Sequence, residues 1–299
     1  MKKYREIQGD GGSGIVAQVT EKLSALNSRM KNVRHKIAVM SGKGGVGKST
    51  VSVGLAASMA RMGHKVGILD ADLNGPSIPK LMGIDDAASL KTGAGGVVPP
   101  TGAYGIKIMS TELFMSSHGQ PINWDGPSST YSWLSVMEAT ALRELIADTE
   151  WGNLDFLFID LPPVIARLRD LTQLLGGLDG VILVTIPSGI SNRIVVKSIN
   201  SVKELGVPII GVVENMKGYA CAHCGKENSP YETVENMTES FEWLGVPYLG
   251  SVPFNKNLQE LSSKGLSEGG AGEAALQSVF GEINKKVFGF LGESPGRTL

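Results

Sequence analysis

The chain has 299 residues, of which 42% are hydrophobic and 19% charged, and its formal net charge is −1. This composition is that of an ordinary globular protein, and the near-neutral charge does not indicate a nucleic-acid partner. No apolar run approaches the ~20 residues that span a membrane, and the N-terminus lacks the apolar core of a signal peptide. We therefore expect a cytoplasmic protein without a nucleic-acid or membrane partner.

The N-terminal residues 1–35 differ from the rest of the chain. Residues 9–14 are rich in glycine, as in a flexible linker, and apolar residues then recur at three- and four-residue spacing. We expect a linker followed by an amphipathic helix here, and a single domain over residues 36–299. The apolar positions of the expected helix are Ile15, Val19, Leu23, Leu26 and Met30.

Short apolar runs alternate with helical stretches from residue 36 onward. Most of these runs are continuous, which is typical of parallel strands covered on both faces. Helical stretches between them indicate right-handed crossovers, so the sequence predicts an α/β fold with a doubly wound, mostly parallel sheet of about seven to eight strands. Residues 91–105 are expected to form a loop or an irregular hairpin. The expected strands are 36–40, 65–70, 106–109, 155–160, 180–186, 208–213 and 247–250.

A glycine-rich segment joins the first expected strand to a helix. It matches the phosphate-binding pattern G-x-x-x-x-G-K-[ST], in which glycines let backbone N–H groups turn toward an anion at a helix N-terminus. We expect Lys48 to contact the β- and γ-phosphates of a nucleotide and the Ser49 hydroxyl to bind Mg²⁺. The expected nucleotide-binding residues are Gly42, Lys43, Gly44, Gly45, Val46, Gly47, Lys48, Ser49 and Thr50.

Lys43 narrows the class of nucleotide-binding protein. The run K-G-G-V-G-K-S that begins at Lys43 resembles the deviant Walker A loop of the MinD/ParA-like ATPases. In those families the extra lysine contacts the phosphates of the nucleotide in the facing subunit. The resemblance therefore implies ATP, a homodimer closed over two nucleotides, and catalytic roles for Lys43 and Lys48. A solvated loop lysine is the alternative, because the simple phosphate-loop pattern does not require Lys43.

Carboxylates follow two of the expected strands. Asp70 and Asp72 come at the end of one strand, where ligand sites of α/β proteins lie, and Asp160 ends an apolar run of Walker B form, whose acid holds Mg²⁺. The resemblance implies that Asp72 is a catalytic residue that positions the attacking water and that Asp70 supports the Mg²⁺ shell. The alternative for Asp70 and Asp72 is a pair of ordinary strand-end carboxylates.

The expected contacts with the adenine base also follow from the resemblance. In the resembling families an asparagine at the end of the sixth strand hydrogen-bonds the adenine edge, which assigns that role to Asn215. Residues 252–257, including Pro253, look like the loop that packs around the base. An asparagine that stabilises a turn is the alternative for Asn215.

The chain has two cysteines, Cys221 and Cys224, in the run C-A-H-C. Thiolates bind zinc or iron–sulfur clusters, and such sites usually need four ligands. The other two ligands must come from another subunit or another molecule, and a two-fold dimer would supply them. His223 lies between the cysteines and is expected to point away from a site that both of them hold.

Three segments make the resemblance more specific. Residues 211–225, which contain both cysteines, look like the signature of the Mrp/Nbp35 (ApbC-type) iron–sulfur cluster carrier ATPases, and residues 70–79 and 197–200 also resemble that family. The similarity implies a P-loop NTPase that binds ATP and Mg²⁺ and hydrolyses ATP slowly. It also implies a homodimer that holds a 4Fe–4S cluster on the cysteine pairs of both subunits and transfers it to apo-proteins.

Two segments depart from the family pattern. Where the family continues Walker B as P-P-G-T-G-D, this chain has P-P-V-I-A-R-L-R-D over residues 162–170, which leaves the hydrolysis rate and its coupling to cluster release open. The family's W-R-G-P-M is W-D-G-P-S at residues 124–128, which exchanges a cation for an anion.

Two other functions remain as alternatives. The first is a dimeric ATPase switch in which the four cysteines hold a structural zinc ion. The second is a positioning ATPase that docks on a membrane, for which the basic and apolar residues 283–291 would serve as an interfacial anchor. A last helix packed on the sheet is the simpler interpretation of that stretch, and the second alternative leaves the cysteine pair unexplained.

Overall fold

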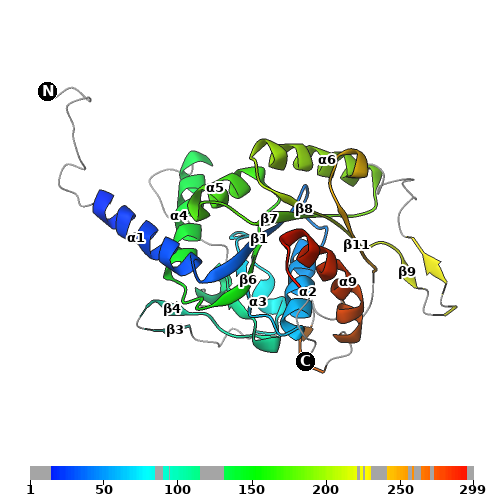
Figure 1. The fold of residues 1–299 in the computed structure, drawn as a ribbon, viewed down its shortest axis with the longest axis horizontal. Helices are drawn as coiled ribbons and strands as arrows, with labels where there is room; N and C mark the ends of the chain where they lie inside the picture. The colour runs from blue at the N-terminus through cyan, green and yellow to red at the C-terminus, as the bar shows by residue number, and fades with distance from the viewer. Residues whose placement is uncertain are drawn as a thin grey trace.

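The computed structural model of the chain describes residues 15–84, 90–93, 95–114, 131–220, 223–224, 226–229, 241–254, 258, 264–269 and 273–294. Within these residues, seven parallel strands form a sheet through the centre of the molecule, with helices on both of its faces (Figure 1). The strands are β1 (Val33–Ser41), β2 (Val66–Asp70), β5 (Lys107–Met109), β6 (Leu154–Asp160), β7 (Gly180–Thr185), β8 (Ile209–Asn215) and β11 (Tyr248–Val252).

The strand order across the sheet is β11-β8-β7-β1-β6-β2-β5, and all neighbouring pairs run parallel. The chain leaves β1 toward β2 on one side and later crosses from β6 to β7 on the other, so the order reverses beside β1. Ligand sites of such sheets lie at the carboxyl ends of the strands near this reversal. The predicted doubly wound α/β fold is confirmed, and each of the seven expected strands is present.

The strand ends differ from the prediction where the sequence is polar. β8 continues to Asn215, and Glu214 pairs with Thr185 of β7, so the ladder extends beyond the last apolar residue. β1 begins at Val33 and runs through three polar residues before its apolar part. It therefore begins inside the predicted N-terminal extension, and the division of the chain at residue 35 stays a prediction.

Buried apolar side chains form two cores, one on each face of the sheet, and the central strand β1 contributes to both. Ile37 and Val39 pack on one face, and Ala38 and Met40 pack on the other. This burial on both faces is why the strand is apolar throughout its central part rather than alternating. The first core includes residues of α2 (Lys48–Arg61), α3 (Ile78–Leu81) and α9 (Glu273–Leu291), and the second includes residues of α1 (Ile15–Met30), α4 (Tyr131–Asp148), α5 (Ile165–Leu175) and α6 (Gly189–Glu204).

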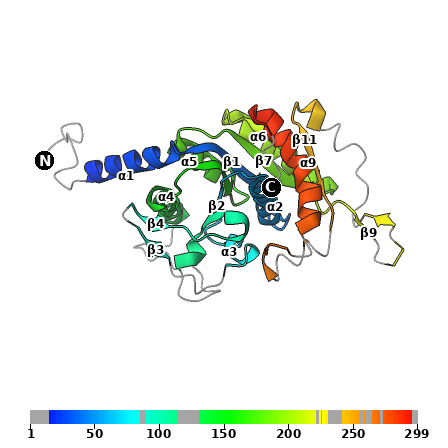
Figure 2. The same cartoon turned by 60° about the horizontal axis from the view of Figure 1, so that its bottom comes forward.

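The predicted N-terminal amphipathic helix is present as α1. Leu26 and Met30, near its C-terminal end, are buried against α4 and α5, whereas Leu23 is exposed. The helix extends from one end of the molecule in both views, opposite the end where the short strand β9 (Tyr219–Ala220) lies (Figure 2).

The predicted excursion between the second and third strands of the sheet contains an antiparallel pair. β3 (Lys91–Thr92) pairs with β4 (Val97–Val98), and a short 3₁₀ helix, η2 (Ala103–Gly105), leads into β5. A second 3₁₀ helix, η3 (Thr111–Phe114), follows β5.

The last helix, α9, packs against α2 and β11. Phe280, Ile283 and Val287 are buried in this contact. The basic and apolar residues 283–291 therefore include a helix face that covers the sheet, as expected of a closing helix. Among the described residues, no helix combines the length and the apolar character needed to cross a bilayer.

Candidate nucleotide-binding site and cysteine hairpin

The loop between β1 and α2 has the backbone geometry of an anion site. Gly45 and Gly47 have φ values of 77° and 75°, in the left-handed region that glycine adopts without a steric cost. Gly47 is the N-cap of α2 and provides no side-chain hydrogen bond to the helix. The first backbone N–H groups of α2 have no partner within the helix, so they are available to a bound phosphate.

A pocket of about 380 Å³ lies over this loop. Its position and size fit the phosphate end of a nucleotide, and Lys48 from α2 and Lys80 from α3 give it positive charge. Lys80 was not expected from the sequence, although it directly follows residues 70–79, which carry part of the resemblance. The pocket is lined by Ser41, Gly44, Gly45, Val46, Gly47, Lys48, Ser49, Thr50, Asp72, Ser77, Lys80, Leu81 and Pro163.

Asp160, at the end of β6, is the centre of a buried hydrogen-bond cluster. Its Oδ2 accepts hydrogen bonds from Lys48 Nζ at 2.6 Å and Ser49 Oγ at 2.7 Å. Its Oδ1 accepts a third from Ser52 Oγ at 2.6 Å. Ser52 lies one helical turn after Lys48, so both side chains face the same strand end. The predicted Walker B acid, the Walker A lysine and the predicted Mg²⁺-binding serine are therefore brought together, and Ser52 joins them.

Asp70 is fully buried and supports the loop that follows β2. Its Oδ2 accepts hydrogen bonds from the backbone N–H groups of Ser77 at 2.8 Å and Ile78 at 3.0 Å. Burial, together with the neighbouring charge of Asp160, raises the pKa of Asp70 to about 7 although these hydrogen bonds act in the opposite direction. Asp70 thus lies beneath the pocket rather than in its lining, and its Mg²⁺ role stays a prediction.

Asp72 lies in the pocket wall, facing the phosphate loop. Burial raises the pKa of Asp72 above its usual value, although the positive charge of Lys48 opposes this shift. A pocket-lining carboxylate of raised pKa can accept a proton from a water molecule or hold that water by a hydrogen bond. The predicted role of Asp72 in positioning water is compatible with this placement and stays a prediction, as do the Mg²⁺ roles of Ser49 and Asp160.

The raised pKa of Asp70 makes stability depend on pH. The carboxyl group titrates near 3.8 when unfolded and near 7 when folded, so the folded state binds the extra proton between these values. Stability therefore falls as the pH rises through this interval. For the wild type we expect the free energy of unfolding to fall by on the order of 3 kcal/mol between about pH 4 and pH 7.5. The Asp70→Asn variant keeps an acceptor for Ser77 and Ile78 and should not show this fall. Urea unfolding of the variant and of the wild type at both pH values measures this difference. The same pH dependence in both proteins would contradict the raised pKa of Asp70.

Asn215, at the end of β8, is hydrogen-bonded to the phosphate loop. Its Nδ2 donates a hydrogen bond to the carbonyl oxygen of Val46 at 2.8 Å, and the residue is 5% exposed. A Cβ placed on Gly47 would overlap this amide nitrogen. The predicted adenine contacts of Asn215 and of Pro253, which directly follows β11, stay predictions.

The start of the loop packs closely against α6. A Cβ on Gly42 would lie 2.5 Å from Cγ2 of Ile194, which leaves no room for a side chain at this position. The adjacent Lys43 is partly exposed, and its carbonyl oxygen accepts a hydrogen bond from Ser41 Oγ at 2.9 Å. The predicted action of Lys43 on a facing subunit stays a prediction.

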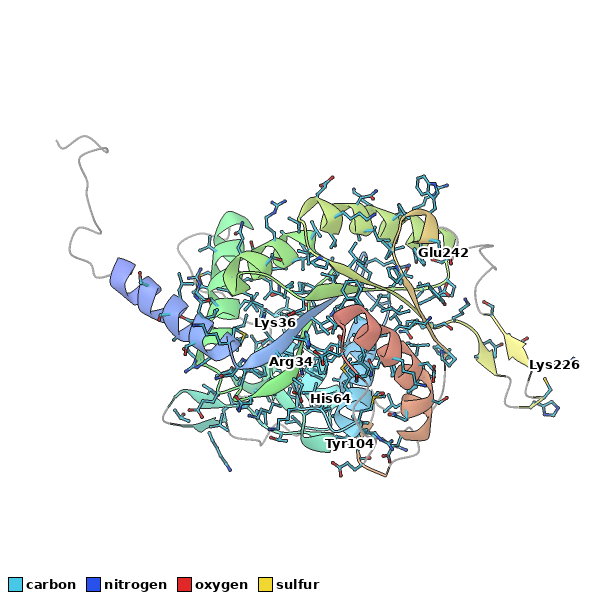
Figure 3. All side chains as sticks on the ribbon, in the orientation of Figure 1. Arg34, Lys36, His64, Tyr104, Lys226 and Glu242 are labelled. Carbon is cyan, nitrogen blue, oxygen red and sulfur yellow. The ribbon has the colours of Figure 1, made fainter. Side chains whose placement is uncertain are left out.

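The cysteine motif lies between two short antiparallel strands, which we call the cysteine hairpin. Tyr219 and Ala220 of β9 pair with Asn228 and Glu227 of β10 (Glu227–Asn228). Cys224 is exposed and makes no disulfide, and Cys221 lies outside the described residues. Figure 3 shows the labelled Lys226 at the edge of the molecule, beyond the strands of the sheet. The hairpin therefore exposes Cys224 outside the central sheet.

Residues 162–170, which depart from the family pattern after Walker B, include the first turns of α5. Arg167, in the first turn of α5, forms an ion pair with Glu138 of α4, and Glu138 accepts a hydrogen bond from Asn74 Nδ2 at 2.7 Å. This contact chain links the helix after Walker B to the loop that contains Asp72. The other departing segment, residues 124–128, lies outside the described residues.

Comparisons with known proteins agree with the predicted family. Residues 32–288 match the ParA family model described as NUBPL iron-transfer P-loop NTPase. The iron–sulfur cluster carrier protein of Methanocaldococcus jannaschii is 39% identical over 242 residues, which cover 81% of this chain and 80% of that protein. The cytosolic Fe–S cluster assembly factor CFD1 of Yarrowia lipolytica is 35% identical over 272 residues, which cover 87% of this chain and 88% of that protein.

Two solved structures show the same architecture. A nucleotide-binding protein of Archaeoglobus fulgidus, in complex with ADP, has a TM-score of 0.66 and 30% identity over 80% of this chain and 90% of that chain. The cell division ATPase MinD of Pyrococcus furiosus has a TM-score of 0.54 over 84% of this chain and 99% of that chain, and at 19% identity this likeness concerns the fold alone. The chain belongs to the ParA-type P-loop NTPases of the NUBPL iron-transfer family.

Proposed function

We propose that this protein is an ATP-hydrolysing carrier that holds an iron–sulfur cluster between two copies of itself and transfers it to apo-proteins. The observation that carries the proposal is that one chain joins a pocket over the glycine-rich loop to a hairpin that exposes Cys224. The relatives named as iron–sulfur cluster carriers support the same function. The word cytosolic in the name of the Yarrowia relative supports a cytoplasmic location.

The nucleotide half of the proposal assigns ATP to the pocket over the phosphate loop. The backbone N–H groups at the start of α2, with Lys48 and Lys80, would bind the phosphates. Ser49 and Asp160 would hold Mg²⁺, which would neutralise phosphate charge. Asp72 would orient the attacking water from the pocket wall. We infer slow hydrolysis, because Pro163 lines the pocket and is followed by Val164 and Ile165, whose side chains offer no hydrogen-bond donor.

The cluster half of the proposal requires a dimer. One chain supplies two thiolates, whereas a 4Fe–4S cluster takes four, so the cysteine pairs of two chains would share it. The exposure of Cys224 supports transfer, because a cluster held at the surface is accessible to a recipient protein. Lys43 would reach the nucleotide of the other subunit and so make the dimer depend on ATP.

Anaerobic reconstitution with iron and sulfide tests this function. We expect about four iron and four sulfide per two chains, with a dimer by light scattering. We expect the Cys221→Ala and Cys224→Ala variants each to bind at least about tenfold less iron than the wild type, because too few thiolates remain. Their affinity for ADP should stay unchanged. His223→Ala is the matched control, because it alters the same exposed turn and should keep the cluster.

Two results would contradict the proposal. A colourless dimer that binds zinc and no iron would support a structural clasp instead. Stoichiometric cluster assembly by the Cys221→Ala variant would exclude a cluster shared between two cysteine pairs.

A further inference from the structure

The segment that leads from β8 to the cysteine hairpin begins in contact with the phosphate loop. Asn215 is hydrogen-bonded to Val46, and Met216 follows with a φ of 60°, which is uncommon for a residue that has a Cβ. A Cβ on Gly47 would lie 3.4 Å from the Cε of Met216, so this side chain also lies against the loop. Backbone held in a rare conformation at the edge of a ligand site points to a functional constraint.

A cluster of three side chains holds the next part of this segment. The Nζ of Lys217 lies 2.8 Å from Oε2 of Glu214, and the same oxygen accepts a hydrogen bond from the Tyr248 hydroxyl at 3.1 Å. Lys217 Nζ lies 3.4 Å from that hydroxyl oxygen and 5.5 Å from the centroid of the ring. We call these residues the Glu214–Lys217–Tyr248 clasp.

The clasp is built around a buried charge. The side chain of Glu214 is 2% exposed, and a buried carboxylate is costly unless hydrogen-bonded partners surround it. Burial lowers the pKa of Lys217, but the hydrogen bond and charge of Glu214 outweigh it and hold that pKa above its usual value. The lysine therefore stays charged at neutral pH, and the segment is held to the sheet through a charge-assisted contact.

Backbone hydrogen bonds continue the restraint to the base of the hairpin. The N–H of Lys217 donates to the carbonyl of Val252 at 3.0 Å, and the N–H of Phe254 donates to the carbonyl of Gly218 at 2.8 Å. Tyr219, the first residue of β9, comes directly after Gly218. Each residue from Glu214 to Gly218 is thus attached to the sheet, the phosphate loop or the end of β11.

We propose that this segment transmits nucleotide binding to the cysteines, with the Glu214–Lys217–Tyr248 clasp as its positioning device. A bound nucleotide fixes the backbone of Val46 and Gly47, which fixes Asn215, and the clasp passes that restraint to the hairpin. The proposal rests on the proposed function for the role of the cysteines as cluster ligands. The restraint itself concerns the protein without any cluster and is measurable there.

Thiol reactivity of the cluster-free full-length protein measures the restraint. The chain has two cysteines and both lie in the motif, so the colour released from 5,5′-dithiobis(2-nitrobenzoic acid) reports on this motif alone. We expect saturating ADP with Mg²⁺ to slow thiol modification about fivefold or more, the lower end of typical coupling between two sites. An unchanged rate in the wild-type protein would overturn the proposal.

Variants of the clasp separate coupling from nucleotide binding. The double variant Lys217→Met/Glu214→Gln removes both charges, so no unpaired carboxylate stays buried. We expect it to bind ADP with unchanged affinity, because none of the clasp residues lines the pocket, and to lose the effect of ADP on thiol reactivity. The single variant Lys217→Arg should keep that effect, since an arginine can also donate to Glu214. Tyr248→Phe, a milder change that keeps the ring, should reduce it.

Lys285→Met is the matched control. Lys285 forms an ion pair with Glu282 at the same three-residue spacing, at 2.6 Å, on the exposed surface of α9. We expect this variant to respond to ADP as the wild type does. A full ADP effect in the folded double variant would overturn the clasp's role. If wild type shows the ADP effect but assembles no iron–sulfur cluster, the proposed function fails while the coupling stands.

Discussion

We expect the Lys48→Ala variant to hydrolyse ATP at least about 100-fold more slowly than the wild type. A loss of this size is typical when one preorganised group that stabilises a transition state is removed. The Lys48 side chain is 8% exposed and lines the phosphate pocket, so bulk solvent does not screen its charge there. A phosphate-release assay with saturating ATP and Mg²⁺ measures the loss, and ADP titration of the same variant separates binding from turnover.

The same substitution should also lower stability, because Asp160 is fully buried. Without Lys48 its carboxylate keeps the hydroxyl groups of Ser49 and Ser52 but has lost its cationic partner. We expect a decrease of about 3 kcal/mol in the free energy of unfolding. Urea unfolding measures this change in the same preparations.

The double variant Lys48→Ala/Asp160→Asn is the control for this loss. It removes both charges, so most of the stability should return while ATP turnover stays lost. Recovery of turnover in the double variant would mean that Lys48 acts mainly by neutralising Asp160. In that case the assignment of Lys48 to the phosphates would be wrong.

The cluster around Asp160 shows which part of the site the sequence could predict. Lys48, Ser49 and Asp160 each belong to a motif whose residue types and spacing are set by phosphate and Mg²⁺ chemistry. Ser52 belongs to no such motif. Its role depends on the distance between the first turn of α2 and the end of β6, two segments separated by about 100 residues in the chain. Such a contact exists only after the sheet has formed, so a local pattern does not contain it.

The strands were predicted correctly because burial on both faces makes most of them continuous apolar runs. Their ends were predicted less well, because the polar residues Glu214 and Asn215 continue the ladder of β8. Both of these residues contact other parts of the site, Glu214 through Lys217 and Asn215 through Val46. The local pattern thus failed where strand residues also act in the link between the two sites, as expected of functional positions.

The cysteine motif was recognised by its spacing, but its placement was not predicted. β9 and β10 have two residues each, too short for an alternating pattern to indicate a strand. The spacing C-x-x-C indicates the chemistry of the thiolates without indicating where the sheet holds them. The structure adds that β9, which precedes the motif, is joined by residues 216–218 to the end of β8, the strand whose last residue contacts the phosphate loop.

The second large effect is expected for Gly47→Ala. Gly47 has a φ of 75°, where a residue with a Cβ is strained by about 1–2 kcal/mol. The added Cβ would also overlap Nδ2 of Asn215, whose amide is held by its hydrogen bond to Val46. We expect a decrease of about 3 kcal/mol in the free energy of unfolding, from strain and overlap together, and a loss of ADP binding.

Two neighbouring glycines provide matched controls for these two causes. Gly45 has a φ of 77° but open space around a Cβ, so Gly45→Ala should show the strain alone, about 1–2 kcal/mol. Gly44 has open space and no left-handed φ, so Gly44→Ala should leave stability unchanged or raise it by about 0.5 kcal/mol. Urea unfolding of the three variants gives this order directly. Equal losses for Gly45→Ala and Gly47→Ala would show that Asn215 can move away from the loop, and the Asn215–Val46 contact would then not be the rigid connection that the coupling between the two sites requires.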